Sequence, residues 1–266
     1  MGKMAEESLR LDQALTALGY FASREQARRS LLAGEVEINN SRTVKPGLSV
    51  LVKYRGEGGE AYLFAKGKEL KVNLREKMPY VSRGGYKLAA GLDMSGISPE
   101  GMDCLDVGAS TGGFTDVLLQ RGAKHVFALD CGYGQLHDKI RHDERVTVME
   151  KFNARFLKPE DLGTRVDLAV ADVSFISLKL VAPPMKGCLK PGGLMVVLVK
   201  PQFEVGPEKL SKGGVVRDEA DRLEALRDIR SFLEGEGFDI LGECESPIVG
   251  PAGNHEFLLA AKLREA

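Results

Sequence analysis

Residues 102–114 of the sequence read M-D-C-L-D-V-G-A-S-T-G-G-F, and this stretch decides the fold. A short apolar run carries Asp106, a glycine-rich turn follows with Gly108, Gly112 and Gly113, and an apolar helical segment begins at the last residue. A strand, a glycine turn and a helix in this order place a nucleotide-like ligand at the helix N-terminus, where free backbone N–H groups point outward. Glycines let the backbone approach such a ligand because they carry no Cβ. The stretch therefore predicts a ligand-binding turn.

Further apolar runs along the chain also end in a charged residue. Residues 126–130 and 168–172 end in Asp130 and Asp172, and the run 194–199 is followed by Lys200. Apolar strands that alternate with helices are typical of a parallel sheet covered on both faces. Ligands of such sheets bind at the carboxyl ends of the strands, where these charged residues are expected to lie. The helical segments that separate the strands are predicted over residues 114–120, 178–188 and 219–234.

The glycine spacing, G-x-x-x-G-G, indicates which ligand the turn binds. It departs from the dinucleotide fingerprint G-x-G-x-x-G, which disfavours an NAD-dependent oxidoreductase. It resembles motif I of S-adenosylmethionine-dependent methyltransferases, and this resemblance implies S-adenosylmethionine as the cofactor. Asp130 is then expected to accept hydrogen bonds from the ribose hydroxyls, and Asn153, after a possible strand over 146–149, to lie by the adenine. Asp106 is expected to orient the methionine amino group or the loop, and the alternative is a carboxylate held by loop amides for structure alone.

Composition limits the classes of protein that fit. Hydrophobic residues make up 43% of the 266 residues, which is enough for a proper core. No run of about 18 apolar residues exists and the first residues are charged, so we expect neither a transmembrane helix nor a signal peptide. The four cysteines lie far apart without a C-x-x-C pair, and the four histidines show no ligand spacing. We therefore expect a cytoplasmic protein without a metal site or a disulfide framework.

The net charge of −1 conceals a basic first part and an acidic remainder. Residues 1–87 hold 16 Lys and Arg against 10 Asp and Glu, and the remainder holds 21 against 28. Such an asymmetry suggests that the first part meets a polyanion, although small domains also vary this much by chance.

The first 60 residues resemble the S4 RNA-binding domain. Two predicted helices, the first with Ser8 as its N-cap and the second beginning at Ser23, precede strands at 36–38 and 49–54. Asn40 stands where the family usually has glycine, and both residues tolerate a left-handed turn. The family resemblance rests on Arg10-Leu11-Asp12, Leu15, Gly19, Ser23-Arg24, Ala27, Gly34 and Val36-Glu37-Ile38-Asn39.

In the S4 family the basic face of the second helix lies against structured RNA, so the resemblance implies RNA contacts. Such contacts go to phosphates, and they position the RNA without specifying its sequence. The alternative is an arginine-rich face that is merely solvated. The residues expected to bind RNA are Arg10, Arg24, Arg28, Arg29, Ser82 and Arg83.

Lys87, Asp172, Lys200 and Glu256 form the candidate catalytic set. Lysines beside buried strands are uncommon because an unpaired buried ammonium is costly, so a shared cleft with the two carboxylates is expected. A buried ion-pair network without chemistry is the alternative. Residues 80–256 resemble the FtsJ-like ribose 2′-O-methyltransferases, which use a Lys-Asp-Lys-Glu tetrad in this chain order. Within these methyltransferases, the chain is most similar to the TlyA (hemolysin A-like) family, which carries an S4 domain in front of the methyltransferase domain. The matching stretches are 82–88, 106–114, 132–136, 172–178, 200–204 and 253–257.

The resemblance implies methyl transfer from S-adenosylmethionine to a ribose hydroxyl of ribosomal RNA. A lysine serves as a base only in its neutral form, which burial or a second cation favours. By analogy, Lys200 is expected to be the base, held by Asp172, and Lys87 to position the substrate with Glu256 as an anchor. The residues expected to bind the cofactor are Asp106, Gly108, Ser110, Gly112, Gly113, Phe114, Asp130, Asn153 and Asp172.

The whole chain is therefore predicted to be a Rossmann-like α/β methyltransferase domain with a small α+β S4 domain in front. The expected boundaries are 8–64 for the S4 domain, 65–79 for a highly charged linker or short connecting strand, and 80–266 for the methyltransferase domain. The expected partner is ribosomal RNA or a ribosomal subunit, and neither a membrane nor a particular oligomeric state is predicted. A membrane-active hemolysin and a non-enzymatic RNA-binding factor are the rival interpretations.

Overall fold

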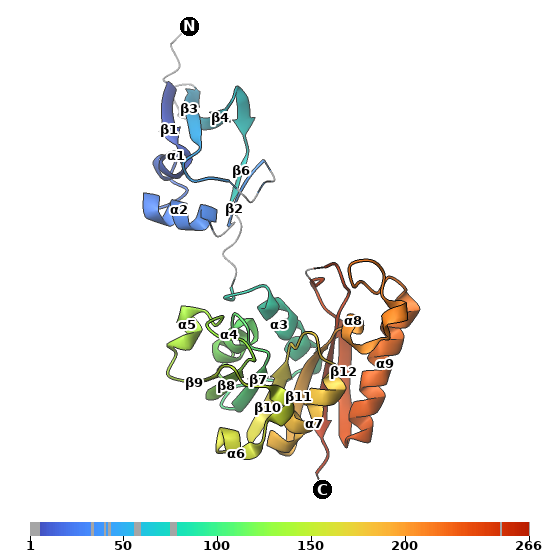
Figure 1. The fold of residues 1–266 in the computed structure, drawn as a ribbon. Helices are drawn as coiled ribbons and strands as arrows, with labels where there is room; N and C mark the ends of the chain where they lie inside the picture. The colour runs from blue at the N-terminus through green and yellow to red at the C-terminus, as the bar shows by residue number, and fades with distance from the viewer. Residues whose placement is uncertain are drawn as a thin grey trace. The chain divides into compact units, whose positions relative to one another are not determined.

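The computed structural model describes residues 6–32, 35–39, 41, 44–55, 60–74, 79–250 and 252–265. The chain forms two compact units, Met1–Pro79 and Tyr80–Ala266, here called unit 1 and unit 2 (Figure 1). Expectations for Gly34, Asn40 and the charged residues at 75–78 lie outside the described residues.

Unit 1 packs two helices against short antiparallel strands. In its described part, β1 (Glu6–Arg10), β3 (Ser49–Arg55), β4 (Glu60–Ala65) and β5 (Lys68–Leu70) form one sheet, and β2 (Val36–Ile38) pairs with β6 (Val72–Leu74). The core lies between these strands and the apolar faces of α1 (Leu11–Ala17) and α2 (Arg24–Leu32). Gly19, with φ of 77°, follows the end of α1, and the Ser23 hydroxyl accepts a hydrogen bond from the Gln26 N–H at the start of α2.

One local expectation for unit 1 was wrong. Ser8 is not a helix cap, because it lies in β1 and α1 begins only after Arg10. In the segment 65–79, of the two expected alternatives, the described residues form short strands: β5 and β6 extend the sheets of unit 1 through pairs with β4 and β2. These strands have only three residues each, so alternation along them is too brief to show among the charged side chains.

Unit 2 contains one large mixed sheet. Within the described residues its strand order is β12-β13-β11-β10-β7-β8-β9, and β7 (Asp103–Val107), from the glycine-turn stretch, lies near the middle. Its parallel neighbours are β10 (Val166–Ala171) and β8 (His125–Leu129), and β9 (Val146–Met149) and β11 (Leu189–Val199) come next on either side.

The expectation of a wholly parallel sheet was incomplete. β13 (Phe257–Leu263) runs antiparallel between β11 and β12 (Phe238–Glu245). Because β13 is reversed, the residue that precedes it lies at the same edge of the sheet as the carboxyl ends of β7, β10 and β11. This reversal is what brings Glu256 to that edge.

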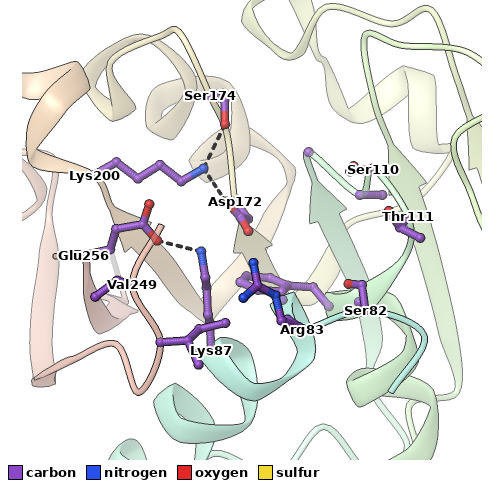
Figure 2. A pocket seen from close by; sticks show the side chains of 16 residues that line it. Ser82, Arg83, Lys87, Ser110, Thr111, Asp172, Ser174, Lys200, Val249 and Glu256 are labelled. Atoms are coloured by element: carbon purple, nitrogen blue, oxygen red, sulfur yellow. Dashed lines mark hydrogen bonds and ion pairs between the residues drawn. The ribbon is translucent and has the colours of Figure 1, made fainter. Parts of the chain in front are cut away.

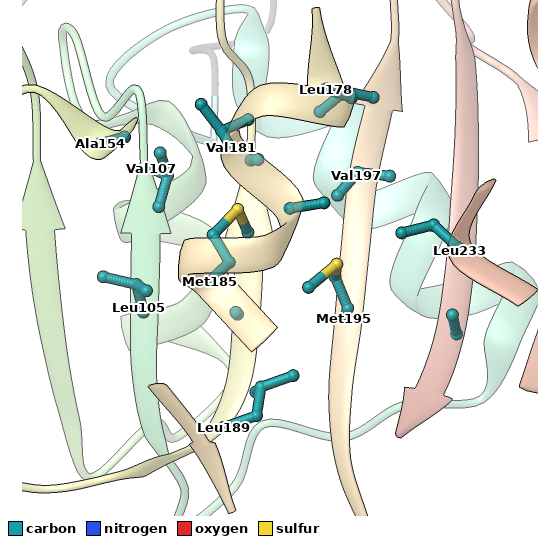
Figure 3. Close-up of a cluster of buried hydrophobic side chains, with 14 of the residues drawn as sticks. Leu105, Val107, Ala154, Leu178, Val181, Met185, Leu189, Met195, Val197 and Leu233 are labelled. Atoms are coloured by element: carbon teal, nitrogen blue, oxygen red, sulfur yellow. The ribbon is translucent and has the colours of Figure 1, made fainter. Parts of the chain in front are cut away.

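Helices cover both faces of this sheet. One face packs against α3 (Gly84–Ser95), α4 (Gly113–Gln120) and α5 (Asp138–Arg141). The other packs against η1 (Ala154–Phe156), α6 (Pro159–Leu162), α7 (Leu178–Cys188) and α9 (Glu219–Gly235). Figure 3 shows the second cluster, in which Met185 of α7 lies between Leu105 of β7 and Met195 of β11. The short α8 (Pro201–Glu204) and η2 (Pro207–Lys209) follow β11. No helix among the described residues is long and apolar enough to cross a membrane.

Candidate active site at the carboxyl edge of the sheet

Two adjoining pockets lie at the carboxyl edge of the unit 2 sheet. The first, here called the Asp130 pocket, has a volume of about 490 Å³ and is lined by Asp130, Asn153 and the loop that follows β10. The second, here called the Lys200 pocket, has a volume of about 390 Å³ and holds Lys87, Lys200 and Glu256. The two pockets share four lining residues: Gly108, Ser110, Asp172 and Ser174. A group that passes from one pocket to the other therefore passes these four residues.

The register of the sheet explains why Asp172 and Gly108 meet. Ala171 pairs with Val107 at the ends of β10 and β7, so the next residues of the two strands are neighbours. Gly108 has a φ of 86°, and a Cβ on it would lie 2.5 Å from the carbonyl oxygen of Asp172. Any larger residue at position 108 would push the two strand ends apart, which is the physical reason for glycine here.

The tetrad residues form two ion pairs in the Lys200 pocket (Figure 2). Lys200 Nζ lies 2.6 Å from Asp172 Oδ1, and Lys87 Nζ donates to Glu256 Oε2 at 2.6 Å. Lys87 and Lys200 are only 7% and 8% exposed, and Glu256 is 1% exposed. Each buried ammonium thus has a carboxylate, which offsets part of its desolvation cost.

Lys87 reaches the site because α3 lies very close to the sheet. A Cβ on Gly91, one turn after Lys87, would lie 3.1 Å from Val196 of β11 and 3.2 Å from Leu258 of β13. Lys200 and Glu256 come together because Val199 and Phe257 pair across the antiparallel β11–β13 ladder, and each tetrad residue stands one position beyond that pair.

Sequence reasoning missed Ser174, Gln202 and Glu204, which support this arrangement. Lys200 Nζ donates to Ser174 Oγ at 2.9 Å, and Gln202 Nε2 lies 3.5 Å from Glu256 Oε1. Glu204 accepts hydrogen bonds from the Ser177 hydroxyl at 2.6 Å and the Leu178 N–H at 2.8 Å. Burial raises the pKa of Glu204 despite these two bonds. Glu204 therefore fastens the loop that carries the tetrad aspartate. The sequence feature that could have identified Glu204 was its position in the stretch 200–204, which begins with Lys200.

Phe175 stands in the same loop and is unusual in two ways. It is 91% exposed, and its φ of 62° is rare for a residue other than glycine. Its ring centroid lies 5.2 Å from that of Phe203, and it lines the Asp130 pocket. The loop thus presents an aromatic ring to solvent at the Asp130 pocket.

The Asp130 pocket fits a nucleoside. Asp130 Oδ2 accepts from the Ser110 N–H at 2.8 Å and Oδ1 from the Gly132 N–H at 2.6 Å, which fixes the carboxylate between two loops. Each carboxylate oxygen accepts more than one hydrogen bond, so acceptor capacity remains for hydroxyl groups in the pocket. Asn153 lines the same pocket and caps η1 by accepting from the Arg155 N–H.

The other residues expected to bind a cofactor fall into two groups. Gly113 and Phe114 line the Lys200 pocket, whereas Asp106 and Gly112 line neither pocket. Asp106 is fully buried; its Oδ2 accepts from the Thr115 hydroxyl at 2.6 Å, and its Oδ1 has no hydrogen-bond partner among the described residues. Thr115, in the first turn of α4, thus holds the carboxylate.

The residues expected to bind RNA lie in both units. Ser82 and Arg83 line the Lys200 pocket in unit 2. In unit 1, Arg10 and Arg24 donate to the buried Asp12, while Arg28 and Arg29 pair with Glu25 on the surface of α2. All four arginine side chains are 47–79% exposed and so remain accessible to a polyanion. No cluster of three or more metal-ligating side chains occurs among the residues that the structure describes.

The parallel sheet, the glycine turn and the paired lysines together define a methyltransferase with a Rossmann-like fold. Residues 80–263 match the model of the FtsJ-like methyltransferases, and residues 9–53 match the S4 domain. The chain belongs to the FtsJ-like methyltransferase family, in the TlyA group that carries an S4 domain in front.

Relatives and a solved structure agree with this assignment. The chain is 43% identical to the 16S/23S rRNA (cytidine-2′-O)-methyltransferase TlyA of Mycobacterium tuberculosis, over 94% of this chain and 88% of that protein. It is 38% identical to Hemolysin A of Brachyspira hyodysenteriae, over 94% of this chain and 98% of that protein. A solved structure of a candidate hemolysin from Streptococcus thermophilus superposes with a TM-score of 0.72 at 41% identity, over 97% of this chain and 90% of that one.

The family uses S-adenosylmethionine, which is therefore the cofactor of this enzyme. The Asp130 pocket suits it, because the Asp130 carboxylate can accept hydrogen bonds from ribose hydroxyls and the Asn153 side chain adds a polar amide to the same pocket.

Proposed function

We propose that this protein transfers a methyl group from S-adenosylmethionine to the 2′-hydroxyl of a ribose in ribosomal RNA. The observation that carries the proposal is the junction of the two pockets. The nucleoside-sized Asp130 pocket opens at Asp172 onto a pocket that contains two buried lysine–carboxylate pairs. The names of the relatives and the S4 domain support an RNA acceptor.

S-adenosylmethionine supplies a methyl group that its sulfonium already activates. The protein has to align the hydroxyl with that methyl group and to remove the hydroxyl proton. Lys200, in its neutral form, takes this proton as the ribose oxygen forms its bond to the methyl carbon and the carbon–sulfur bond breaks. Asp172 then stabilises the resulting ammonium at 2.6 Å.

Lys87 and Glu256 position the acceptor. Their ion pair is almost fully buried, so it forms a fixed wall of the Lys200 pocket rather than a mobile surface contact. Ser82 and Arg83 lie in the same pocket and offer a hydroxyl and a cation to the neighbouring phosphate. A ribose enters this arrangement only from a nucleotide whose backbone is accessible.

The acceptor RNA is held in addition by unit 1. Arg10, Arg24, Arg28 and Arg29 contact phosphates of a folded RNA, and these contacts supply affinity rather than sequence readout. We propose that the folded RNA is presented in a ribosomal subunit, and that the reaction takes place in the cytoplasm where the subunits are.

Labelled methyl transfer to purified small and large ribosomal subunits tests the proposal. We expect label in ribose of at least one subunit RNA, located by mapping of alkali-resistant linkages. Lys200→Ala should lower the rate by about 10²–10⁴-fold, the usual contribution of a general base. Donor affinity, measured by calorimetry, should change little. Normal turnover in Lys200→Ala would remove Lys200 from the mechanism, and label in a base or in protein would reject the ribose acceptor.

Leakage of liposomes in the absence of both RNA and donor would favour the rival interpretation as a membrane-active protein. RNA binding without any transfer of label would favour a non-enzymatic RNA-binding factor.

A further inference from the structure

Ser174 contacts the lysine at the centre of the site and has no place in the tetrad. Its Oγ accepts a hydrogen bond from Lys200 Nζ at 2.9 Å, while Asp172 Oδ1 lies 2.6 Å from the same nitrogen (Figure 2). Ser174 also lines both pockets, so it stands at their junction. Among the described residues, these two oxygens are the only hydrogen-bond or ion-pair partners of the Lys200 ammonium.

The number of acceptors around Lys200 Nζ matters because the amine gains a proton when it acts as a base. A lysine ammonium carries three N–H donors. After loss of one proton, the neutral amine has two N–H donors and one lone pair. Ser174 Oγ accepts a hydrogen bond from one N–H of this nitrogen, and the Asp172 carboxylate lies at ion-pair distance from it.

With one N–H group held by Ser174 and the Asp172 carboxylate 2.6 Å from the nitrogen, the lone pair is left for a different direction. Lys200 is 8% exposed and lines the Lys200 pocket, so the open direction leads to the pocket and not to bulk solvent. We propose that Ser174 is a positioning residue that, together with Asp172, fixes the rotation of the Lys200 amine so that its lone pair faces the ribose hydroxyl. This inference rests on the proposed function and assigns to it a residue outside the tetrad.

The loop geometry supports a fixed hydroxyl at this position. Glu204 fastens the loop three residues beyond Ser174 through its bonds to Ser177 and Leu178. At the other end, the Asp172 N–H donates to the Val107 carbonyl at 3.0 Å. Ser174 is thus held between two anchored points, although its side chain reaches an open junction.

The test compares Ser174→Ala and Ser174→Thr with the wild type, on the ribosomal subunit that the wild type methylates. Ser174→Ala removes the acceptor, and we expect kcat to fall about tenfold, as loss of one hydrogen bond to a charged group implies. The KM for the subunit and the donor Kd should stay within twofold. Ser174→Thr retains a hydroxyl and should restore kcat to within about threefold of the wild type. Ser98→Ala serves as the control, because Ser98 is exposed before β7, at the opposite end of that strand.

Three results would overturn the inference. They are an unchanged kcat in Ser174→Ala, a change confined to KM or donor Kd, and a Ser174→Thr variant as slow as Ser174→Ala. Donor binding by both variants reports that unit 2 is folded. If the wild type itself transfers no methyl group to RNA, the proposed function fails, and that outcome is distinct from any difference among the Ser174 variants.

Discussion

Asp12 of unit 1 and Asp106 of unit 2 are both completely buried, and their pKa values are shifted in opposite directions. Asp12 of unit 1 accepts hydrogen bonds from Arg10 at 3.1 and 3.0 Å and from Arg24 at 3.3 Å. Burial acts to raise its pKa, but the hydrogen bonds from these two arginines outweigh burial and leave the pKa below its usual value. Asp12 is therefore a charged anchor that holds two cations at the surface of unit 1.

Asp106 of unit 2 has no such cation. Burial raises its pKa from 3.8 to about 7, the Thr115 hydroxyl opposes this rise, and the negative charges of Asp172 and Asp130 add to it. The comparison shows that burial alone does not decide whether an aspartate is ionised; the number of cationic partners does. It also predicts that the two units respond to pH in opposite directions.

The largest expected effect concerns Asp106. Because its folded-state pKa lies above the unfolded value, the folded chain binds the proton more tightly, so this contribution is full below about pH 4 and is lost as pH rises to about 7. A rise of that size corresponds to about 4 kcal/mol of unfolding free energy. Hydrogen exchange of β7 amides, measured between pH 5 and 8, should show the loss.

Asp106→Asn provides the control for this dependence of the unfolding free energy on pH. The asparagine has no charge to lose, so its stability should be flat across the same pH range, whatever constant offset the new amide introduces. If the unfolding free energy of Asp106→Asn falls with pH as steeply as that of the wild type, another group titrates in this range. The two buried aspartates would then not differ as described.

The second effect concerns Asp12. Asp12→Ala leaves Arg10 and Arg24 without their shared acceptor and should destabilise unit 1 by about 1–3 kcal/mol. In the wild type, the lowered pKa means that this stability is present above about pH 4 and is lost as pH falls further. Exchange of α1 amides between pH 3 and 7 measures both. Acid-resistant protection of α1 would show that Asp12 is not the anchor.

The smallest expected effect concerns Arg28 and Arg29, which are not held by a buried aspartate as Arg10 and Arg24 are. Among the described residues, Arg28 and Arg29 pair with the exposed Glu25 of their own helix, at 3.9 and 3.3 Å, and such pairs contribute little to stability. The double variant Arg28→Ala, Arg29→Ala should keep unit 1 stability and lower RNA affinity, with a log–log salt slope shallower by about 2. Lys124→Ala, at the far end of the unit 2 sheet, is the matched charge control. An unchanged salt slope would reject these arginines as phosphate contacts.

The sequence predicts the parts of this molecule whose signal is local. Asp130, Asp172 and Lys200 end apolar runs, so their place at one edge of the sheet follows from the pattern. The tetrad as a set came from the family resemblance. Ser174 could not be found by pattern, because a serine in a loop is common and only the folded loop brings it to Lys200.

The Lys87–Glu256 pair shows the other limit. These residues are 169 positions apart, and they meet only because β13 is antiparallel and α3 lies close to it. No local pattern states the direction of a strand within a sheet. The antiparallel pairing of β6 with β2 could not be predicted for the same reason, since no local pattern shows which strand lies beside which.

The place of β13 has a consequence for the biosynthesis of the enzyme. The strand lies between β11 and β12 in the sheet but follows both in the chain. During translation the gap between these two neighbours stays open until residue 263 has left the ribosome, so unit 2 completes its sheet only then. The glycine turn and Asp130 are made more than a hundred residues earlier. A nascent chain thus contains the glycine turn and Asp130 long before it contains Glu256, so the tetrad is completed well after the strands beside the Asp130 pocket.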